Sequence, residues 1–226
     1  MTTYFITGID TGIGKTYATA MLAKSLLDRG KSVITAKLAQ TGCVGIAEDI
    51  IQHRKIMGID LLSEDNQKLT CPYTFKLPAS PHLAARQENT AIDANVIINA
   101  ISQLEKIYDI VLVEGAGGLL VPLDDDLLTA DFVAAQRWPV IIVSSPRLGS
   151  INHTLMTLEC AHNRNCDVVG IIYNMHQQSA PVITADSQKI ISDKLKQYNP
   201  TAKLIELPKI DDFENLPETN LHTLIP

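Results

Sequence analysis

The fold is decided by the stretch Ile6-Thr7-Gly8-Ile9-Asp10-Thr11-Gly12-Ile13-Gly14-Lys15-Thr16. A β-prone segment, residues 3–7, leads into a glycine-rich turn that ends in Gly-Lys-Thr, and apolar residues at helical spacing follow as far as Leu27. A turn of this kind points backbone N–H groups at the start of a helix toward one place, where they bind phosphate. The pattern therefore predicts a P-loop, with Lys15 on the β- and γ-phosphates of a nucleotide and Thr16 on Mg²⁺.

The bulk composition fits one globular domain over residues 1–226. Hydrophobic residues make up 46% of the chain, which is too many for a disordered protein. The net charge of −6 and the lack of a basic cluster argue against nucleic acid as a partner. No apolar run is long enough to span a bilayer, and the chain opens on a strand and not on a signal peptide. We therefore expect no membrane partner and a cytoplasmic location.

Predicted strands and helices alternate along the chain. Strands are expected at 32–37, 109–113, 140–143, 168–173 and 202–207, helices at 47–57, 93–106, 151–164 and 186–198, and irregular structure in the proline-containing segment 58–86. Continuous apolar strands in β-α-β order predict an α/β fold, mainly a parallel sheet with helices on both faces, like that of P-loop NTPases. Ligands bind beyond the carboxyl ends of such strands, so the residues that end each strand should meet at one edge.

A second motif, Val113-Glu114-Gly115-Ala116-Gly117-Gly118, lies at the end of the strand predicted at 109–113. It brings a carboxylate to the strand tip, where a P-loop enzyme requires a metal ligand, and its glycines allow close approach of backbone to phosphate or substrate. The alternative is an exposed glutamate at a strand end. Asp49, near the start of the helix 47–57, is a further candidate Mg²⁺ ligand; its alternative role is to cap that helix or compensate its dipole.

Two more segments lie at the predicted edge of the sheet. Lys37 ends the second strand beside the position expected for Lys15, and two cations next to a triphosphate suggest a reaction that holds another anion near the γ-phosphate. The alternative is a lysine whose stem packs at a strand end. The turn Arg147–His153 leads into a helix, with Ser150 as the expected N-cap and free N–H groups able to bind a carboxylate; it could equally be an ordinary capped turn.

Together, these segments resemble the dethiobiotin synthetase family. The matching stretches follow the family's order over most of the chain: 8–16, Lys37 with Thr41-Gly42, Pro72–Phe75 with Ser80-Pro81-His82, 113–118, and 148–153. The extended loop with Gly-x-Asp-Thr is itself a trait of that family. The chain departs from the family pattern at Leu38, where a proline is usual, and in the short stretch between Gly42 and Asp49.

The resemblance implies an ATP- and Mg²⁺-dependent ligase of biotin biosynthesis. Such an enzyme converts 7,8-diaminopelargonate and CO₂ into dethiobiotin, with ADP and phosphate as the other products, through a carbamate and a carbamic–phosphoric anhydride. The resemblance also implies a homodimer, in which the turn 148–152 of one subunit receives the carboxylate of a substrate bound mainly to the other subunit.

Matched positions give the residues their implied roles. The expected catalytic residues are Lys37, Lys15 and Thr11. ATP is expected at Gly12, Ile13, Gly14, Lys15, Thr16, Tyr17, Glu114, Gly117, Asn174 and Pro208, the last two at adenine. The small substrate is expected at Thr11, Lys37, Thr41, Leu148, Gly149, Ser150 and Asn152, and Mg²⁺ at Thr16, Asp49 and Glu114.

The alternative function is a P-loop regulatory ATPase switch of the partition or septum-positioning type. Such switches share this fold, but they carry a lysine where this chain has Asp10. A second alternative, an amidoligase that uses ammonia from a glutaminase module, would need a large additional domain, for which 226 residues leave no space.

Overall fold

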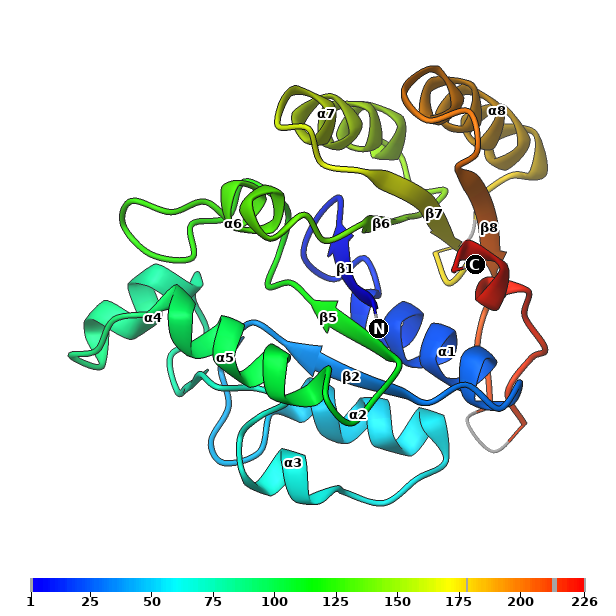
Figure 1. Cartoon of the computed structure of the whole chain (residues 1–226). Helices are drawn as coiled ribbons and strands as arrows, with labels where there is room; N and C mark the ends of the chain where they lie inside the picture. The colour runs from blue at the N-terminus through cyan, green and yellow to red at the C-terminus, as the bar shows by residue number, and fades with distance from the viewer. Residues whose placement is uncertain (1, 178, 213–214, 226) are drawn as a thin grey trace.

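A six-stranded parallel sheet forms the centre of the protein, in the order β2-β5-β1-β6-β7-β8 (Figure 1). The structure is a computed structural model that describes residues 2–177, 179–212 and 215–225. Its strands are β1 (Thr2–Gly8), β2 (Val33–Lys37), β5 (Ile110–Glu114), β6 (Val140–Ser144), β7 (Val168–Asn174) and β8 (Lys203–Leu207). Two short parallel strands, β3 (Gln40–Thr41) and β4 (Thr74–Phe75), pair outside this sheet.

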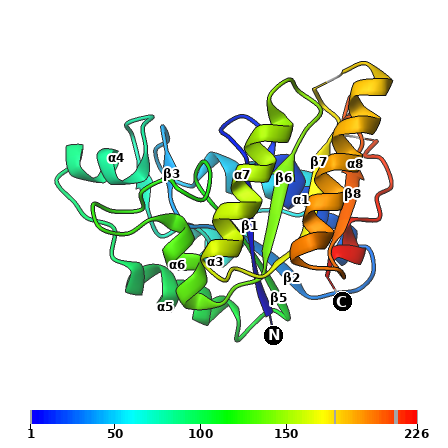
Figure 2. The same ribbon diagram turned by 90° about the horizontal axis from the view of Figure 1, so that it is seen from above.

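Helices cover both faces of the sheet, as the sequence predicts (Figures 1 and 2). Helix α1 packs against α2, β2 and β5 on one face, while α7 and α8 pack on each other and on β7 and β8 at the other face. The helices are α1 (Lys15–Leu27), α2 (Glu48–Met57), α3 (Ser63–Asn66), α4 (Pro81–Gln87), α5 (Ala94–Leu104), α6 (Thr129–Gln136), α7 (Ser150–Asn163), α8 (Pro181–Tyr198) and the 3₁₀ helix η1 (Leu221–Leu224). In the described part of the chain, no helix combines the length and the apolar character that a membrane crossing requires.

The central strands are apolar because both of their faces are covered. Every residue of β5 and β6 is buried, and neither strand shows the alternation of polar and apolar residues that a one-sided sheet would impose. Leu38, which stands in place of the proline usual in the family, is also buried in the core. The α/β class is therefore confirmed.

Proline positions explain two differences from the predicted elements. Helix α4 begins at Pro81, inside the segment expected to be irregular, and α8 begins at Pro181, ahead of the expected start at residue 186. Proline is favourable at the first position of a helix, because the N–H that it lacks would have no partner there. The expectation of irregular structure over 58–86 is wrong where α3, β4 and α4 form, and α6 was not predicted at all.

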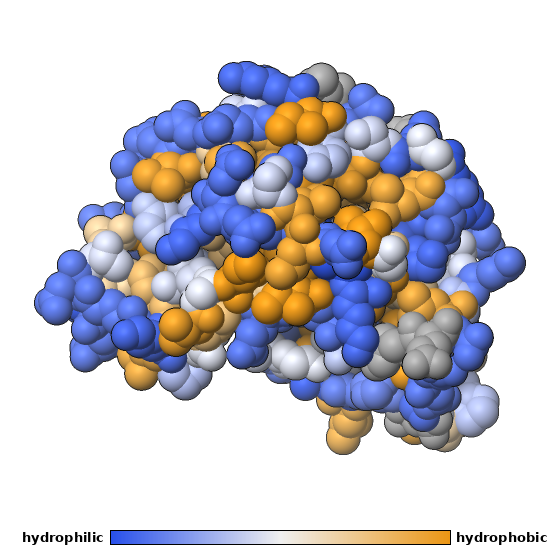
Figure 3. All heavy atoms as spheres, turned by 90° about the horizontal axis from the view of Figure 1, so that it is seen from below, coloured by the Kyte–Doolittle hydropathy of each residue, from blue (hydrophilic) through white to orange (hydrophobic). Residues whose placement is uncertain are grey.

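Helix α2 has an unusual polarity. It buries His53 and Arg54 completely or nearly so, while Ile51 on its outer side is 45% exposed. Figure 3 shows the surface on this side of the molecule, where hydrophobic side chains lie between hydrophilic ones. Arg54 donates to both oxygens of Asp65, at 2.9 Å and 2.8 Å, and to Thr35 Oγ1 of β2 at 2.7 Å. Polar contacts of Arg54 thus help to fix helix α2 to β2 and α3, beside its buried apolar residues Ile50, Ile56 and Met57.

Candidate active site

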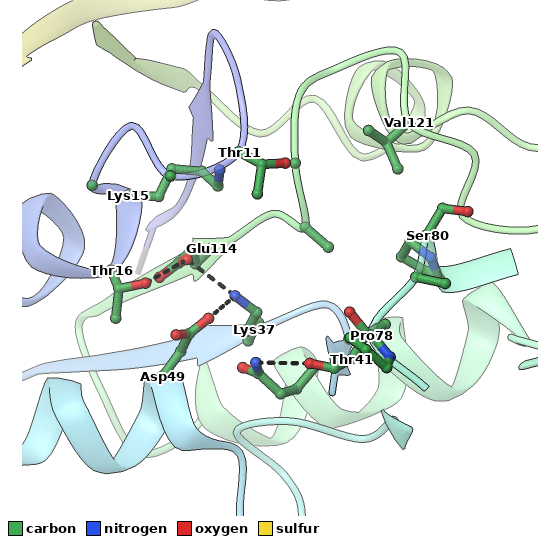
Figure 4. A pocket seen from close by; sticks show the side chains of 18 of the residues that line it. Thr11, Lys15, Thr16, Lys37, Thr41, Asp49, Pro78, Ser80, Glu114 and Val121 are labelled. Atoms are coloured by element: carbon green, nitrogen blue, oxygen red, sulfur yellow. Dashed lines mark hydrogen bonds and ion pairs between the residues drawn. The ribbon is translucent and has the colours of Figure 1, made fainter. Parts of the chain in front are cut away.

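The carboxyl ends of the parallel strands meet at one edge of the sheet, as predicted. Lys37, the last residue of β2, is the register partner of Glu114, the last residue of β5. A cleft of about 640 Å³ opens at this edge (Figure 4). The cleft is lined by the following residues to which the sequence assigned roles: Thr11, Gly12, Gly14, Lys15, Thr16, Tyr17, Lys37, Thr41, Asp49, Glu114 and Gly117.

The loop between β1 and α1 depends on glycines with left-handed backbone. Gly12 has φ +71°, and Gly14, the N-cap of α1, has φ +92°. A Cβ atom on Gly14 would lie only 2.2 Å from Nδ2 of Asn174, the residue that ends β7. That same Nδ2 donates to the carbonyl of Ile13 at 2.9 Å, so the end of β7 holds the loop in place.

Lys15 is a buried cation at the start of α1. Its side chain is mostly buried, and Nζ donates to the backbone carbonyl of Asp10 at 3.1 Å. Burial lowers the pKa of Lys15 below its ordinary value; Lys37 acts in the same direction, and Glu114 opposes the shift. An anion in the cleft would stabilise the charge of Lys15, as a P-loop lysine requires.

Lys37 lies between two carboxylates. Its Nζ forms ion pairs with Asp49 and, at 3.1 Å, with Glu114 Oε1 (Figure 4). Burial alone would lower the pKa of Lys37, but the charges of Glu114 and Asp49 outweigh it and raise that pKa above its ordinary value. Because Lys37 is only 5% exposed, it is not a lysine extended into solvent at a strand end.

Glu114 is an ionised carboxylate inside the protein. Its residue exposure is 1%, which contradicts the alternative of an exposed glutamate at a strand end. Burial would raise the pKa of Glu114, but the charge of Lys37 and the hydrogen bond from His53 lower it well below its usual range. Thr16 Oγ1 donates to Glu114 Oε1 at 3.2 Å, so the end of β5 meets the start of α1.

Asp49 does not cap its helix. The N-cap of α2 is Ala47, with no side-chain hydrogen bond at the cap, and Asp49 in the first turn pairs with Lys37 instead. The structure therefore joins Asp49 to the residues predicted as catalytic. Its negative charge in the first turn still complements the helix dipole.

Sequence reasoning missed His53. This residue is fully buried, and its Nε2 lies 2.9 Å from Glu114 Oε2. Since the ionised Glu114 can only accept a hydrogen bond, we assign the proton to Nε2 of His53. The signal in the sequence was the spacing of four residues from Asp49, which places both side chains on one face of α2.

The oxygen atoms at the cleft fit a Mg²⁺ ion that arrives with a nucleotide. Thr16 Oγ1 and the carboxylates of Asp49 and Glu114 are hard oxygen donors on the cleft wall, the type that Mg²⁺ prefers. Among the described residues, no cluster of three or more His, Cys, Asp or Glu side chains forms a metal site by itself. Mg²⁺ in nucleotide sites takes most of its other ligands from phosphate and water.

A smaller hollow of about 150 Å³ lies beside the first turn of α1 and the end of β7. Tyr17, Asn174 and Leu207 line it, together with His176 and Ile210. Pro208 follows Leu207 directly in the chain. The two residues expected at adenine therefore lie in or beside a separate hollow, which Tyr17 shares with the main cleft.

The turn 148–152 lies outside the cleft. Leu148 is fully exposed, Asn152 is also exposed, and Ser150 is buried with Oγ 3.3 Å from Ser145 Oγ. The expectation that Ser150 caps the helix is wrong, because α7 begins at Ser150 and its N-cap is Gly149.

Comparisons with known proteins find relatives over most of the chain. Residues 2–217 match the family model described as an AAA domain. The chain is 48% identical over 197 residues to the ATP-dependent dethiobiotin synthetase BioD 2 of Pasteurella multocida, covering 87% of this chain and 92% of that protein. It is 50% identical over 193 residues to the ATP-dependent dethiobiotin synthetase BioD of Chlorobaculum tepidum, covering 85% and 81% of the two chains.

Solved structures show the same fold at low identity. The MinC:MinD cell division protein complex of Aquifex aeolicus matches with a TM-score of 0.58 at 17% identity, covering 93% of this chain and 83% of that one. The pNOB8 ParA structure bound to nonspecific DNA matches with a TM-score of 0.55 at 15% identity, covering 94% and 83%. These likenesses concern the fold alone. The sequence relatives identify the chain more narrowly: it belongs to the family of ATP-dependent dethiobiotin synthetases.

Proposed function

We propose that this chain uses ATP, Mg²⁺ and CO₂ to carboxylate 7,8-diaminopelargonate and close the ureido ring of dethiobiotin. The observation that carries the proposal is the pair of buried ammonium groups, Lys15 and Lys37, on the wall of one cleft beside a P-loop. Relatives named as dethiobiotin synthetases favour this function over a regulatory ATPase switch. The cytoplasm stays our prediction for where it acts.

The chemistry needs charge neutralisation and positioning more than a protein nucleophile. One amine of the substrate attacks CO₂ and loses a proton, which gives a carbamate. A carbamate oxygen attacks the γ-phosphorus of ATP and ADP leaves, which gives a carbamic–phosphoric anhydride. The second amine attacks the anhydride's carbonyl carbon, loses a proton and expels phosphate, and this closes the five-membered ring. Phosphoryl transfer of this kind depends on holding anions in line.

The residues of the cleft match these demands. The N–H groups of the loop around Gly12 and Gly14, together with Lys15, hold the phosphates of ATP. Lys37 holds the carbamate, and Thr11 and Thr41 contact the diamine from the same cleft wall. Thr16, Asp49 and Glu114 would hold Mg²⁺, which neutralises charge on the β- and γ-phosphates when bound.

The base of ATP fits the smaller hollow. Tyr17 and His176 supply aromatic rings there, Leu207 and Ile210 supply apolar surface, and Asn174 supplies an amide. A heteroaromatic base stacks on such surfaces and takes its orientation from a polar group. Asn174 would thus serve both adenine and the carbonyl of Ile13, to which it already donates.

We further propose that the enzyme acts as a homodimer with shared sites. Leu148 is fully exposed and lies outside its own cleft, on a turn that Arg147 ties to Asp10 of the phosphate loop by an ion pair. An exposed leucine at that place suits contact with a second copy. The exposed Asn152 could then reach the substrate in the partner's cleft.

The activity is tested by omission. Protein is incubated with MgATP, bicarbonate and diaminopelargonate, each is left out in turn, and ADP and dethiobiotin are measured by chromatography and mass spectrometry. We expect ADP release that requires both small substrates and matches dethiobiotin in amount. ADP release that ignores diaminopelargonate would support the ATPase switch instead.

Shared sites are tested by mixing two inactive variants, Lys37→Gln and Asn152→Ala, after mild dissociation. If each cleft takes Lys37 from one subunit and Asn152 from the other, the mixed dimer holds one intact site. Random reassociation should then restore about a quarter of the wild-type activity. A mixture as inactive as its components would contradict shared sites.

A further inference from the structure

The two oxygens of Glu114 face different partners. Oε1 accepts from Thr16 Oγ1 at 3.2 Å and from Lys37 Nζ at 3.1 Å, on the side of the cleft. Oε2 lies 2.9 Å from His53 Nε2, inside the protein. The terminal torsion of a glutamate is broad and weakly restricted, so a fixed partner on one oxygen decides how the other one is presented. His53 is that partner.

The burial of His53 has no explanation in packing alone. Its Nδ1 is buried and has no hydrogen-bond partner among the described residues. A buried polar atom without a partner is unfavourable, and an apolar side chain would fill the same space without that disadvantage. Glu114 is the polar group that His53 does contact, so the contact accounts for a histidine at this position.

Helix α2 delivers two groups to the same place. Asp49 and His53 lie one turn apart on one face of α2, and the ion pair of Arg54 with Asp65 fixes the helix. Asp49 reaches Lys37, while His53 reaches Glu114 from behind. The rotation of one helix therefore sets the arrangement of both carboxylates.

We propose that His53 is a positioning residue that orients Glu114 so that Oε1 faces the Mg²⁺–nucleotide site. The proposal rests on the proposed function, since the ion and the nucleotide belong to it. Carboxylates that bind metals are commonly held by a hydrogen bond of this kind, and removal of such a partner weakens metal affinity by about 10- to 100-fold. His53 would act through Glu114 without touching ATP or the substrate.

The test measures metal binding without turnover. Mn²⁺ affinity is measured by electron paramagnetic resonance in the presence of a non-hydrolysable ATP analogue, for wild type, His53→Leu and His53→Gln. The amide nitrogen of glutamine reaches about as far as Nε2 of histidine and keeps the donor. We expect the Mn²⁺ dissociation constant to rise about 10- to 100-fold in His53→Leu and to stay within about threefold of wild type in His53→Gln.

The controls separate positioning from general damage. Gln52→Leu changes the neighbouring, half-buried polar residue on the same helix and should leave Mn²⁺ affinity unchanged. Binding of the metal-free ATP analogue should change less than about twofold in both His53 variants, because the phosphate loop is intact. If His53→Leu does not fold by circular dichroism, His53→Asn replaces it, since its shorter amide does not reach Glu114.

The outcomes are decisive. Wild-type Mn²⁺ affinity in folded His53→Leu, or equal weakening in the leucine and glutamine variants, would overturn the proposal. The measurement needs no catalysis, so it is independent of the omission assay. If the protein does not form dethiobiotin, but His53→Leu binds Mn²⁺ more weakly than His53→Gln does, the proposed reaction is wrong and the positioning role of His53 still holds.

Discussion

Lys37 and Glu114 are register partners at the ends of two neighbouring parallel strands, and their charged groups lie 3.1 Å apart. The pairing follows from topology, because β2 and β5 are adjacent and run in the same direction. A cation and a carboxylate are thereby held against each other at the edge where α/β proteins bind ligands. In the proposed function, Lys37 binds an anion and Glu114 a metal ion.

Replacing Lys37 by glutamine should abolish ring closure and leave nucleotide binding measurable. The amide has no charge with which to hold a carbamate near the γ-phosphate, and loss of one such group slows catalysis by roughly 100- to 1,000-fold. Dethiobiotin formation is followed by mass spectrometry and ATP binding by calorimetry. Lys31→Gln, at an exposed lysine, is the matched control and should behave as wild type. Near-normal turnover of Lys37→Gln would remove Lys37 from the mechanism.

Replacing Lys15 by methionine should stabilise the protein without ligand and abolish its stabilisation by ATP. Burial lowers the pKa of Lys15 in the folded state, so below that pKa its ammonium group opposes folding relative to the unfolded chain. Methionine fills similar space without the charge. Each kcal/mol gained raises Tm by about 2–4 °C in a protein of this size.

The same thermal scans, repeated with ATP, show the other half of the Lys15 prediction. Saturation at 100 times Kd stabilises wild type by about 2.7 kcal/mol, and Lys15→Met should show almost none of this. Lys31→Met serves as the surface control. A lower Tm of Lys15→Met without ATP would mean that the charge of Lys15 supports the fold.

The sequence predicts the strands and the residues at their tips because these rest on local patterns. Buried parallel strands are continuous apolar runs, and the glycine-rich loop identifies Lys15 and Thr16 by spacing. Glu114 and Lys37 follow from the rule that parallel strands end at one edge. Each of these inferences needs only the order of residues along the chain. The fold that they imply is confirmed by the structure.

The features that the sequence does not reveal depend on how a helix is rotated about its axis and on contacts between residues far apart in the chain. The contact of His53 with Glu114 requires knowing which face of α2 turns inward, and the buried residues of that helix mix His53 and Arg54 with Ile50, Ile56 and Met57. The ion pair of Asp10 with Arg147 joins residues far apart in sequence. Pro81 was interpreted as a break, although at the first position of α4 it favours a helix, and the start of α8 at Pro181 was not predicted.

Replacing Asp65 by asparagine should destabilise the protein strongly at neutral pH. Arg54 would keep its buried charge without the carboxylate that it binds through two nitrogens, and breaking a buried pair in this way costs about 3–5 kcal/mol. Urea unfolding measures the difference from wild type. Asp60→Asn, at an exposed aspartate, is the control and should change little.

The effect of Asp65→Asn should also depend on pH. Burial would raise the pKa of Asp65, but the hydrogen bonds from Arg54 and from the Leu62 N–H lower it. The stability that this carboxylate supplies is therefore fully present above the unfolded pKa of about 3.9 and is lost as pH falls through the lower folded value. The gap between wild type and variant should be constant from neutral pH to about pH 5 and shrink toward pH 3. If the difference in unfolding free energy between wild type and Asp65→Asn did not change with pH, an ionic role for Asp65 would be contradicted.

Alanine substitutions at Gly12 and Gly14 distinguish two effects: backbone strain in the phosphate loop, and contact of that loop with Asn174. Both have left-handed backbone, so alanine at either position should cost about 1–2 kcal/mol. A Cβ atom meets nothing within 4 Å at Gly12, whereas at Gly14 it would lie 2.2 Å from Asn174 Nδ2. Gly14→Ala should therefore lose more stability and more ATP affinity than Gly12→Ala, because it also displaces the amide that holds the Ile13 carbonyl.

The double variant Gly14→Ala/Asn174→Ala isolates that contact. Removing the Asn174 amide also removes its clash with the Cβ atom at position 14. The unfolding free energy of the double variant should therefore fall by less than the sum of the two single losses, with a coupling of about 0.5–3 kcal/mol. Gly12→Ala/Asn174→Ala is the matched pair and should be additive, because Gly12 has no atom of Asn174 within 4 Å of its Cβ position. Denaturant unfolding of the two cycles gives both couplings. Additive losses at Gly14 would show that backbone strain, and not the end of β7, limits what this position accepts.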